Sequence, residues 1–160
     1  MTPKDRKTLV VRFAAMVAML NPPFKQYEGK SHYVFPSHYY FVHEAPQGLA
    51  VIVLHIFSKP HRSEFTVEFG WSRLGRLPEV LSTALILDDV AAGHMRYLEP
   101  EYLNRVRMFF AKDTWWHFSA AHPDESDSSL TIANKVIRDK VLPFVLRALN
   151  PDDDTNSPSP

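Results

Sequence analysis

Three successive stretches of the chain are rich in aromatic and β-branched residues, which favour strands. They are YVFPSHYYFVH (33–43), LAVIVLHIFS (49–58) and EFTVEFGWS (64–72). The third stretch alternates between two sets of side chains, Phe65, Val67, Phe69 and Trp71 on one face and Glu64, Thr66, Glu68 and Gly70 on the other. A period of two residues is typical of a strand with one face in the core. The short connections between the stretches predict an antiparallel meander.

A helix is predicted at the N-terminus. Thr2 is a suitable N-cap, Pro3 suits the first helical position, and Asp5 completes a capping pattern. Apolar residues then recur at helical spacing and predict a buried stripe of Leu9, Phe13, Met16, Val17 and Leu20. Lys4, Arg6 and Lys7 precede this apolar run, as in a signal peptide, but Arg12 interrupts it, so an amphipathic helix is the better interpretation.

A second long helix is predicted near the C-terminus, with its cap at Asp127 or Ser128 and its end at Asn150-Pro151. Pro143 should kink this helix, because proline removes a backbone donor. Between the meander and this helix, Pro78–Leu87 is either a short helix or extended, and Asn104–Phe110 and Thr114–Phe118 are predicted strands.

The fold class expected from this order is α+β, with an antiparallel sheet of about five strands and the N-terminal and long C-terminal helices packed on one face. Residues 1–150 are predicted to form one domain. Residues 151–160, PDDDTNSPSP, are expected to be a disordered acidic tail because they contain nothing to bury.

Charge and cysteine content exclude several classes of protein. The chain has 18 basic and 18 acidic residues and a formal net charge of zero, which disfavours a dedicated nucleic-acid binder. It has no cysteine, which excludes disulfides, thiolate catalysis and cysteine-ligated metals and is compatible with the cytoplasm. No stretch approaches the ~20 apolar residues of a membrane span.

Three short motifs resemble a known family. FTVEFGWS (65–72), RVRMFF (105–110) and DTWW (113–116) are similar to patterns in small bacterial α+β proteins, the domain of unknown function 4304 family. The resemblance covers the order of elements over most of residues 5–149. It implies the fold already expected and no activity, because the family is itself uncharacterised.

The eight histidines raise the question of a metal site. HEAPQ (43–47) lacks the second histidine of the zinc-protease pattern, and Pro46 breaks the helix that this pattern needs.

The other histidines are distinguished by their positions along the predicted strands. His38 and His43 point to opposite faces of one strand and cannot share an ion without a bulge. His117 and His122 with Asp113 or Asp124 form the best remaining ligand set, although partly exposed histidines are the simpler interpretation. His55 is expected to be buried and hydrogen-bonded. No metal or cofactor is therefore predicted.

Basic and aromatic residues cluster in the turns around the third strand and in the strands that follow, and arginines beside aromatic rings suit recognition of carboxylates, phosphates or proteins. The candidate binding residues are Arg62, Trp71, Arg73, Arg76, Arg107, Trp115 and His117. Ordinary solvated turns are the alternative interpretation. The predicted function is a non-enzymatic bacterial binding or interaction protein of accessory, immunity or regulatory type, with another protein as partner. The alternatives are a small enzyme with a site around Asp113 and His117, or a weak phosphate or nucleic-acid binder.

The adjacent pair Trp115-Trp116 is expected to divide between two environments, because neighbours in a strand point to opposite faces. Trp116 shares its face with Phe118, so Trp116 is predicted to lie in the core and Trp115 on the other side of the strand.

Overall fold

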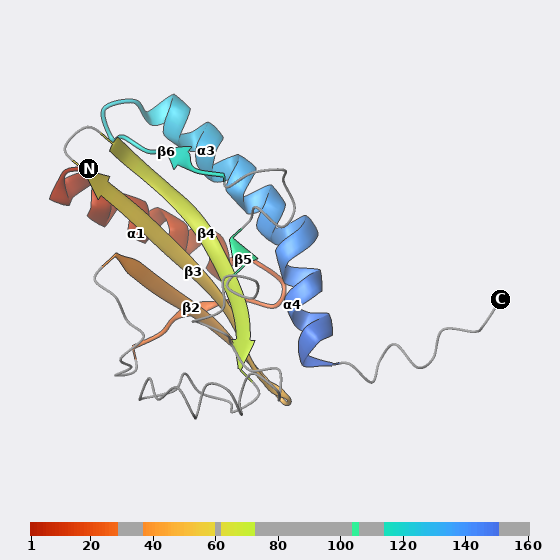
Figure 1. Ribbon diagram of the computed structural model, residues 1–160. Helices are drawn as coiled ribbons and strands as arrows, with labels where there is room; N and C mark the ends of the chain where they lie inside the picture. The colour runs from red at the N-terminus through yellow and green to blue at the C-terminus, as the bar shows by residue number, and fades with distance from the viewer. Residues whose placement is uncertain (29–36, 60–61, 73–103, 106–113, 151–160) are drawn as a thin grey trace.

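The computed structural model describes residues 1–28, 37–59, 62–72, 104–105 and 114–150, and Figure 1 shows how they are arranged. The predicted segment Pro78–Leu87, residues 106–110 of the predicted fourth strand and the tail 151–160 lie outside these residues. The elements in chain order are α1 (Pro3–Ala18), β1 (Lys25–Gln26), β2 (His38–Ala45), β3 (Gly48–Lys59), β4 (Arg62–Ser72), β5 (Asn104–Arg105), β6 (Trp116–His117), α3 (Pro123–Val136), the π-helical segment η2 (Ile137–Val141) and α4 (Leu142–Leu149).

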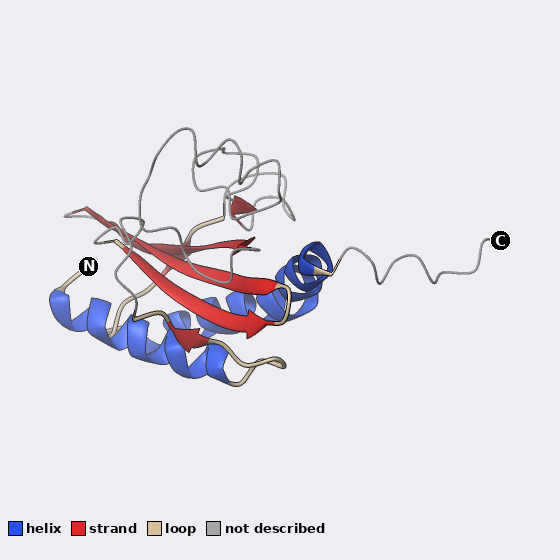
Figure 2. Ribbon diagram, turned by 90° about the horizontal axis from the view of Figure 1, so that it is seen from below, coloured by secondary structure: helices blue, strands red, loops and turns tan. Residues whose placement is uncertain are grey.

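The strands form one antiparallel sheet with the order β1-β2-β3-β4-β5. β5 and β6 both pair with β4, at different points along it. Figure 2 shows the helices on one side of this sheet. The predicted fold class, α+β with helices packed on one face of an antiparallel sheet, is confirmed.

A two-residue turn at Pro46 and Gln47 fixes how β2 pairs with β3. Gly48 follows this turn with φ of 142°, a conformation that glycine adopts without steric cost because it has no Cβ. The register then runs without a break from Ala45 opposite Gly48 to His38 opposite His55. The turn therefore determines which residues of β2 and β3 are neighbours at the far end of the hairpin.

Helix α1 begins as predicted. The Thr2 hydroxyl accepts a hydrogen bond from the Asp5 backbone N–H (3.1 Å), and the Thr2 backbone N–H donates to the Asp5 carboxylate (3.2 Å). The second carboxylate oxygen of Asp5 accepts from the backbone N–H of Ala120 (2.9 Å). One aspartate therefore caps α1 and connects it to the loop before α3.

Helix α3 begins earlier than predicted. It starts at Pro123 with His122 as its N-cap, so the predicted cap at Asp127 or Ser128 is wrong. The PDES segment is helical because proline suits the first turn, where Asp124 and Glu125 also oppose the positive end of the helix dipole. Ser126 is buried, and its hydroxyl donates to the Ser119 carbonyl oxygen (2.8 Å) and accepts from the Ser119 N–H (2.9 Å).

The effect of Pro143 appears in the turn before it. Helical bonding changes to the π type over Ile137–Val141, where the Leu142 N–H donates to the Ile137 carbonyl oxygen. Proline has no backbone N–H and so cannot donate a hydrogen bond to the carbonyl oxygen four residues earlier. The π-helical segment ends directly before α4, whose second residue is Pro143. Backbone bonding is thus altered near Pro143, as the sequence predicts, while the chain stays helical to Leu149.

The main core lies between the helices and one face of the sheet. Leu9, Phe13 and Val17 of α1 enter it, together with Phe65, Val67 and Phe69 of β4. Trp116 is 6% exposed and Phe118 is fully buried, which confirms the predicted core face of this strand. A second apolar cluster on the opposite face comprises Tyr40, Val42, Leu49, Val51 and Val53. Within the described ranges, no helix is both long and apolar enough to cross a bilayer.

Candidate metal centre

Three polar side chains from β2, β3 and β4 meet on the face of the sheet that points away from the helices. His38 pairs with His55 across β2 and β3, and Glu68 lies on β4, diagonal to His55. Val67 and Phe69 point into the main core, so Glu68 between them must point to the opposite face. Three strands thus bring together residues that are far apart in the sequence.

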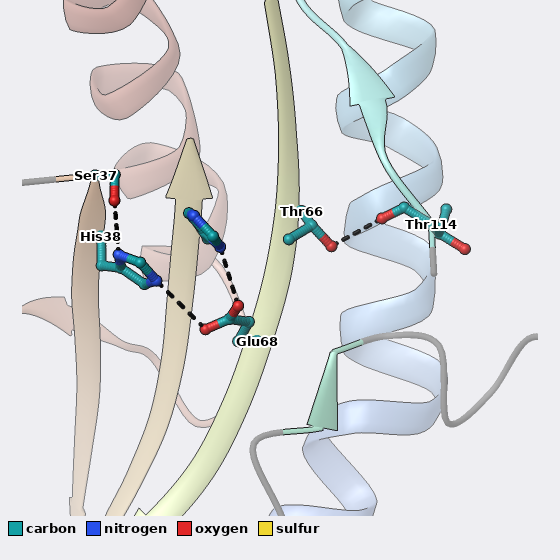
Figure 3. A network of polar contacts seen from close by, with 6 residues as sticks. Ser37, His38, Thr66, Glu68 and Thr114 are labelled. Carbon is teal, nitrogen blue, oxygen red and sulfur yellow. Dashed lines mark hydrogen bonds and ion pairs between the residues drawn. The ribbon is translucent and has the colours of Figure 1, made fainter. Parts of the chain in front are cut away.

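The Glu68 carboxylate lies beside the two imidazoles and contacts both (Figure 3). The His55 Nδ1–H donates to Glu68 Oε1 at 3.0 Å, and His38 Nε2 lies 3.7 Å from Glu68 Oε2. The two imidazole rings stack, with centroids 3.9 Å apart and planes 20° apart. One ligand atom from each residue lies within 4.8 Å of the ligand atoms of the other two. The three residues thus form one compact cluster, which we call the His-His-Glu cluster.

The cluster is largely removed from water. The Glu68 side chain is 8% exposed, and each histidine side chain is 17% exposed. A buried carboxylate is costly unless hydrogen bonds or positive charge compensate it. The imidazoles supply that compensation here. His55 is hydrogen-bonded, as predicted, but it is only partly buried rather than buried. Part of each histidine side chain stays exposed to solvent.

A further contact orients His38. The Ser37 hydroxyl lies 2.9 Å from His38 Nδ1, as Figure 3 shows. Ser37 thus holds the Nδ1 side of the ring and leaves Nε2 as the nitrogen that faces Glu68, where a bound ion would take its lone pair. Histidines that bind metals commonly hold the second ring nitrogen in this way, which fixes both the tautomer and the ring plane.

Trp115 forms a wall beside His55. Its ring meets the His55 ring edge-on at 5.4 Å and the Phe57 ring edge-on at 5.7 Å. Thr66, on the same face of β4, donates its hydroxyl hydrogen to the Thr114 carbonyl oxygen (2.8 Å) and so anchors the residue before Trp115. This bond fixes the backbone next to Trp115, whose indole packs against His55 of the His-His-Glu cluster.

The donor atoms indicate which ions would fit. Two imidazole nitrogens and one carboxylate oxygen suit Zn²⁺, Fe²⁺, Co²⁺ or Ni²⁺, whereas Ca²⁺ and Mg²⁺ prefer oxygen ligands throughout. Ligands about 2.1 Å from a tetrahedral ion are about 3.4 Å apart, so atoms that now lie up to 4.8 Å apart would close by up to about 1.4 Å on binding. The two stacked imidazole rings would also have to tilt toward one ion.

Comparisons with protein-family models, curated proteins and solved structures find no match. The resemblance to the domain of unknown function 4304 family therefore stays a prediction.

The structure separates the predicted binding residues that it describes. Trp71 lies on the helix side of the sheet, where its ring packs edge-on against Phe144 at 6.0 Å. Trp115 lies on the opposite side with His55. His117 is exposed on β6, and Arg62 begins β4. The other predicted residues, Arg73, Arg76, Arg107 and Asp113, lie outside the described residues.

His38 and Glu68 were not recognised as a pair in the sequence. Sequence patterns for metal ligands depend on histidines that lie close together along the chain, whereas this cluster depends on the register between strands. A signal did exist: a two-residue turn at Pro46 and Gln47 places His38 opposite His55. The alternation in β4 then places Glu68 on the same face.

Proposed function

We propose that this protein binds one divalent transition-metal ion through His38 Nε2, His55 Nδ1 and Glu68. The observation that carries the proposal is the convergence of two imidazoles and a buried carboxylate within 4.8 Å. On binding, the ion takes the place of the proton that His55 donates to Glu68, and both imidazoles coordinate in their neutral form. This proposal replaces the sequence-based expectation of a protein without metal.

The surroundings of the cluster support a functional role. The same face of the sheet carries Tyr40, Val42, Val51 and Val53, all buried. An apolar side chain at position 68 would satisfy that environment with no desolvation cost, and buried ionic groups often stabilise a fold less than apolar replacements do. Three titratable residues that meet at one point beside these buried apolar side chains are better explained by a ligand than by stability.

Calorimetric titration of chelator-treated protein with Zn²⁺ tests the proposal. Wild type should bind one ion per chain, and His55→Ala and Glu68→Gln should lose that binding while keeping a native circular dichroism spectrum. His117→Ala is the matched control, because His117 is an exposed histidine and belongs to the alternative ligand set. The proposal fails if wild type binds no ion, or if both cluster variants fold and bind Zn²⁺ as wild type does.

The predicted role as a bacterial, cytoplasmic interaction protein stays a prediction. Its arginine residues Arg73, Arg76 and Arg107 lie outside the described residues, and Trp71 and Trp115 point to opposite faces of the sheet. Metal binding and partner binding are compatible, because the first uses the face of the sheet that points away from the helices and the second would use the loops.

A further inference from the structure

The arrangement of the three donors determines what else the ion would bind. All three side chains project from one face of the sheet, so they approach an ion from one side. Among the described residues, no other histidine, aspartate or glutamate completes the group. Metal sites with three protein ligands keep at least one position for an exchangeable ligand. That position lies on the side of the ion away from the sheet.

The net charge of the metal-loaded site determines which kind of ligand occupies the open coordination position. A divalent ion, one carboxylate and two neutral imidazoles leave a net charge of +1. This charge would lie beside a carboxylate that is 8% exposed and next to the aromatic rings of Trp115 and Phe57. An uncompensated charge in such surroundings is costly, and an anion at the open position removes it.

From these observations we infer that the metal-loaded site binds a small organic carboxylate, whose oxygen coordinates the ion and whose apolar group packs against Trp115. The inference rests on the proposed metal site. The size limit follows from burial, since 17% of each histidine side chain is exposed and only a small solute reaches the cluster. The apolar preference follows from the indole, which Thr66 and Thr114 hold beside His55.

The test uses the full chain loaded with Co²⁺, whose visible absorption reports coordination. Phenylacetate and acetate are titrated separately, and phenylacetamide is the neutral control of matched shape. Both carboxylates should change the Co²⁺ spectrum until the change saturates, and phenylacetate should reach saturation at a lower concentration than acetate. Phenylacetamide should leave the spectrum unchanged. Trp115→Phe should weaken phenylacetate binding slightly, and Trp115→Ala should weaken it more, by roughly threefold to tenfold. Neither substitution should change acetate binding much.

The outcomes separate this inference from the metal site. A Co²⁺ spectrum that appears on loading but does not respond to either carboxylate overturns the inference and leaves metal binding intact. An equal response to phenylacetamide also overturns it. Absence of any Co²⁺ spectrum overturns both proposals. Equal affinity for acetate and phenylacetate in wild type contradicts the role of Trp115.

Discussion

The imidazole rings of His38 and His55 lie face to face, with centroids 3.9 Å apart, and one carboxylate, Glu68, contacts both. Two protonated rings at this distance would repel each other. The lone pairs of the two rings lie in nearly parallel planes, so coordination of one ion requires one ring to tilt toward the other. The following predictions examine this cluster and the fold that supports it.

Metal should stabilise the fold. A ligand that binds only the native state at 100 times its Kd raises the free energy of unfolding by about 2.7 kcal/mol. We expect that increase on adding Zn²⁺ to chelator-treated wild type and to His117→Ala, and no increase in Glu68→Gln. Chemical denaturation with and without Zn²⁺ measures it. An equal increase in Glu68→Gln would place the ion elsewhere.

Ser37 should contribute to metal affinity by orienting His38. Loss of a partner that holds the second nitrogen of a ligating histidine typically weakens metal binding by about 10- to 100-fold. Ser37→Ala should therefore weaken Zn²⁺ binding by at least about tenfold, with stoichiometry unchanged. Ser128→Ala, on the exposed surface of α3, is the control for loss of a serine hydroxyl. Wild-type affinity in Ser37→Ala would show that the 2.9 Å contact has no role in binding.

An apolar version of the cluster should fold well without metal. The triple variant His38→Leu, His55→Val, Glu68→Leu removes three groups that are costly to desolvate, so its free energy of unfolding should equal or exceed that of metal-free wild type, by up to about 4 kcal/mol. Urea denaturation in the presence of chelator measures the difference. A large loss of stability would mean that the cluster is retained for folding rather than for a ligand.

The two adjacent tryptophans should contribute unequally. Trp116 is 6% exposed and its ring lies 5.6 Å from that of Phe65, so Trp116→Ala should cost about 3–5 kcal/mol, as truncation of a large core residue does. Trp115→Ala should cost distinctly less, because Trp115 is only half-buried. Equilibrium unfolding of both variants compares them, and a greater loss from Trp115→Ala would reverse this assignment.

Asp5 should make stability depend on acid pH. The Thr2 hydroxyl, and then the Ala120 N–H, hold the pKa of Asp5 below its ordinary value of 3.8. A carboxyl with a lower pKa in the folded state adds stability that is complete above the unfolded pKa and declines as the pH falls through the folded one. Wild type should therefore exceed Asp5→Asn in stability at pH 7, and the difference should narrow below pH 3.8. Thermal unfolding across this range measures it, and a constant difference would exclude the titration of Asp5.

Local patterns in the sequence predicted the parts of the fold that depend on near neighbours. The alternation in residues 64–72 identified the core face of β4, and Thr2 with Asp5 identified the start of α1. The start of α3 was missed although its signals are local: Pro123 suits the first turn, and Asp124 and Glu125 oppose the helix dipole, so the helix begins five residues earlier than a cap at Asp127 would give. The His-His-Glu cluster was missed because it exists only once three strands are in register.

The bonds that join α1 to the second half of the chain have a consequence for folding during synthesis. Asp5 and Ala120 are 115 positions apart, as are Arg12 and Asp127, which form an ion pair between α1 and α3. Helix α1 leaves the ribosome before these partners, which are made 115 residues later. At about 5–20 residues per second, α1 spends several seconds without them. During that interval α1 can pack on β1, β2 and β3, and its attachment to α3 is completed after the second half of the chain has been made.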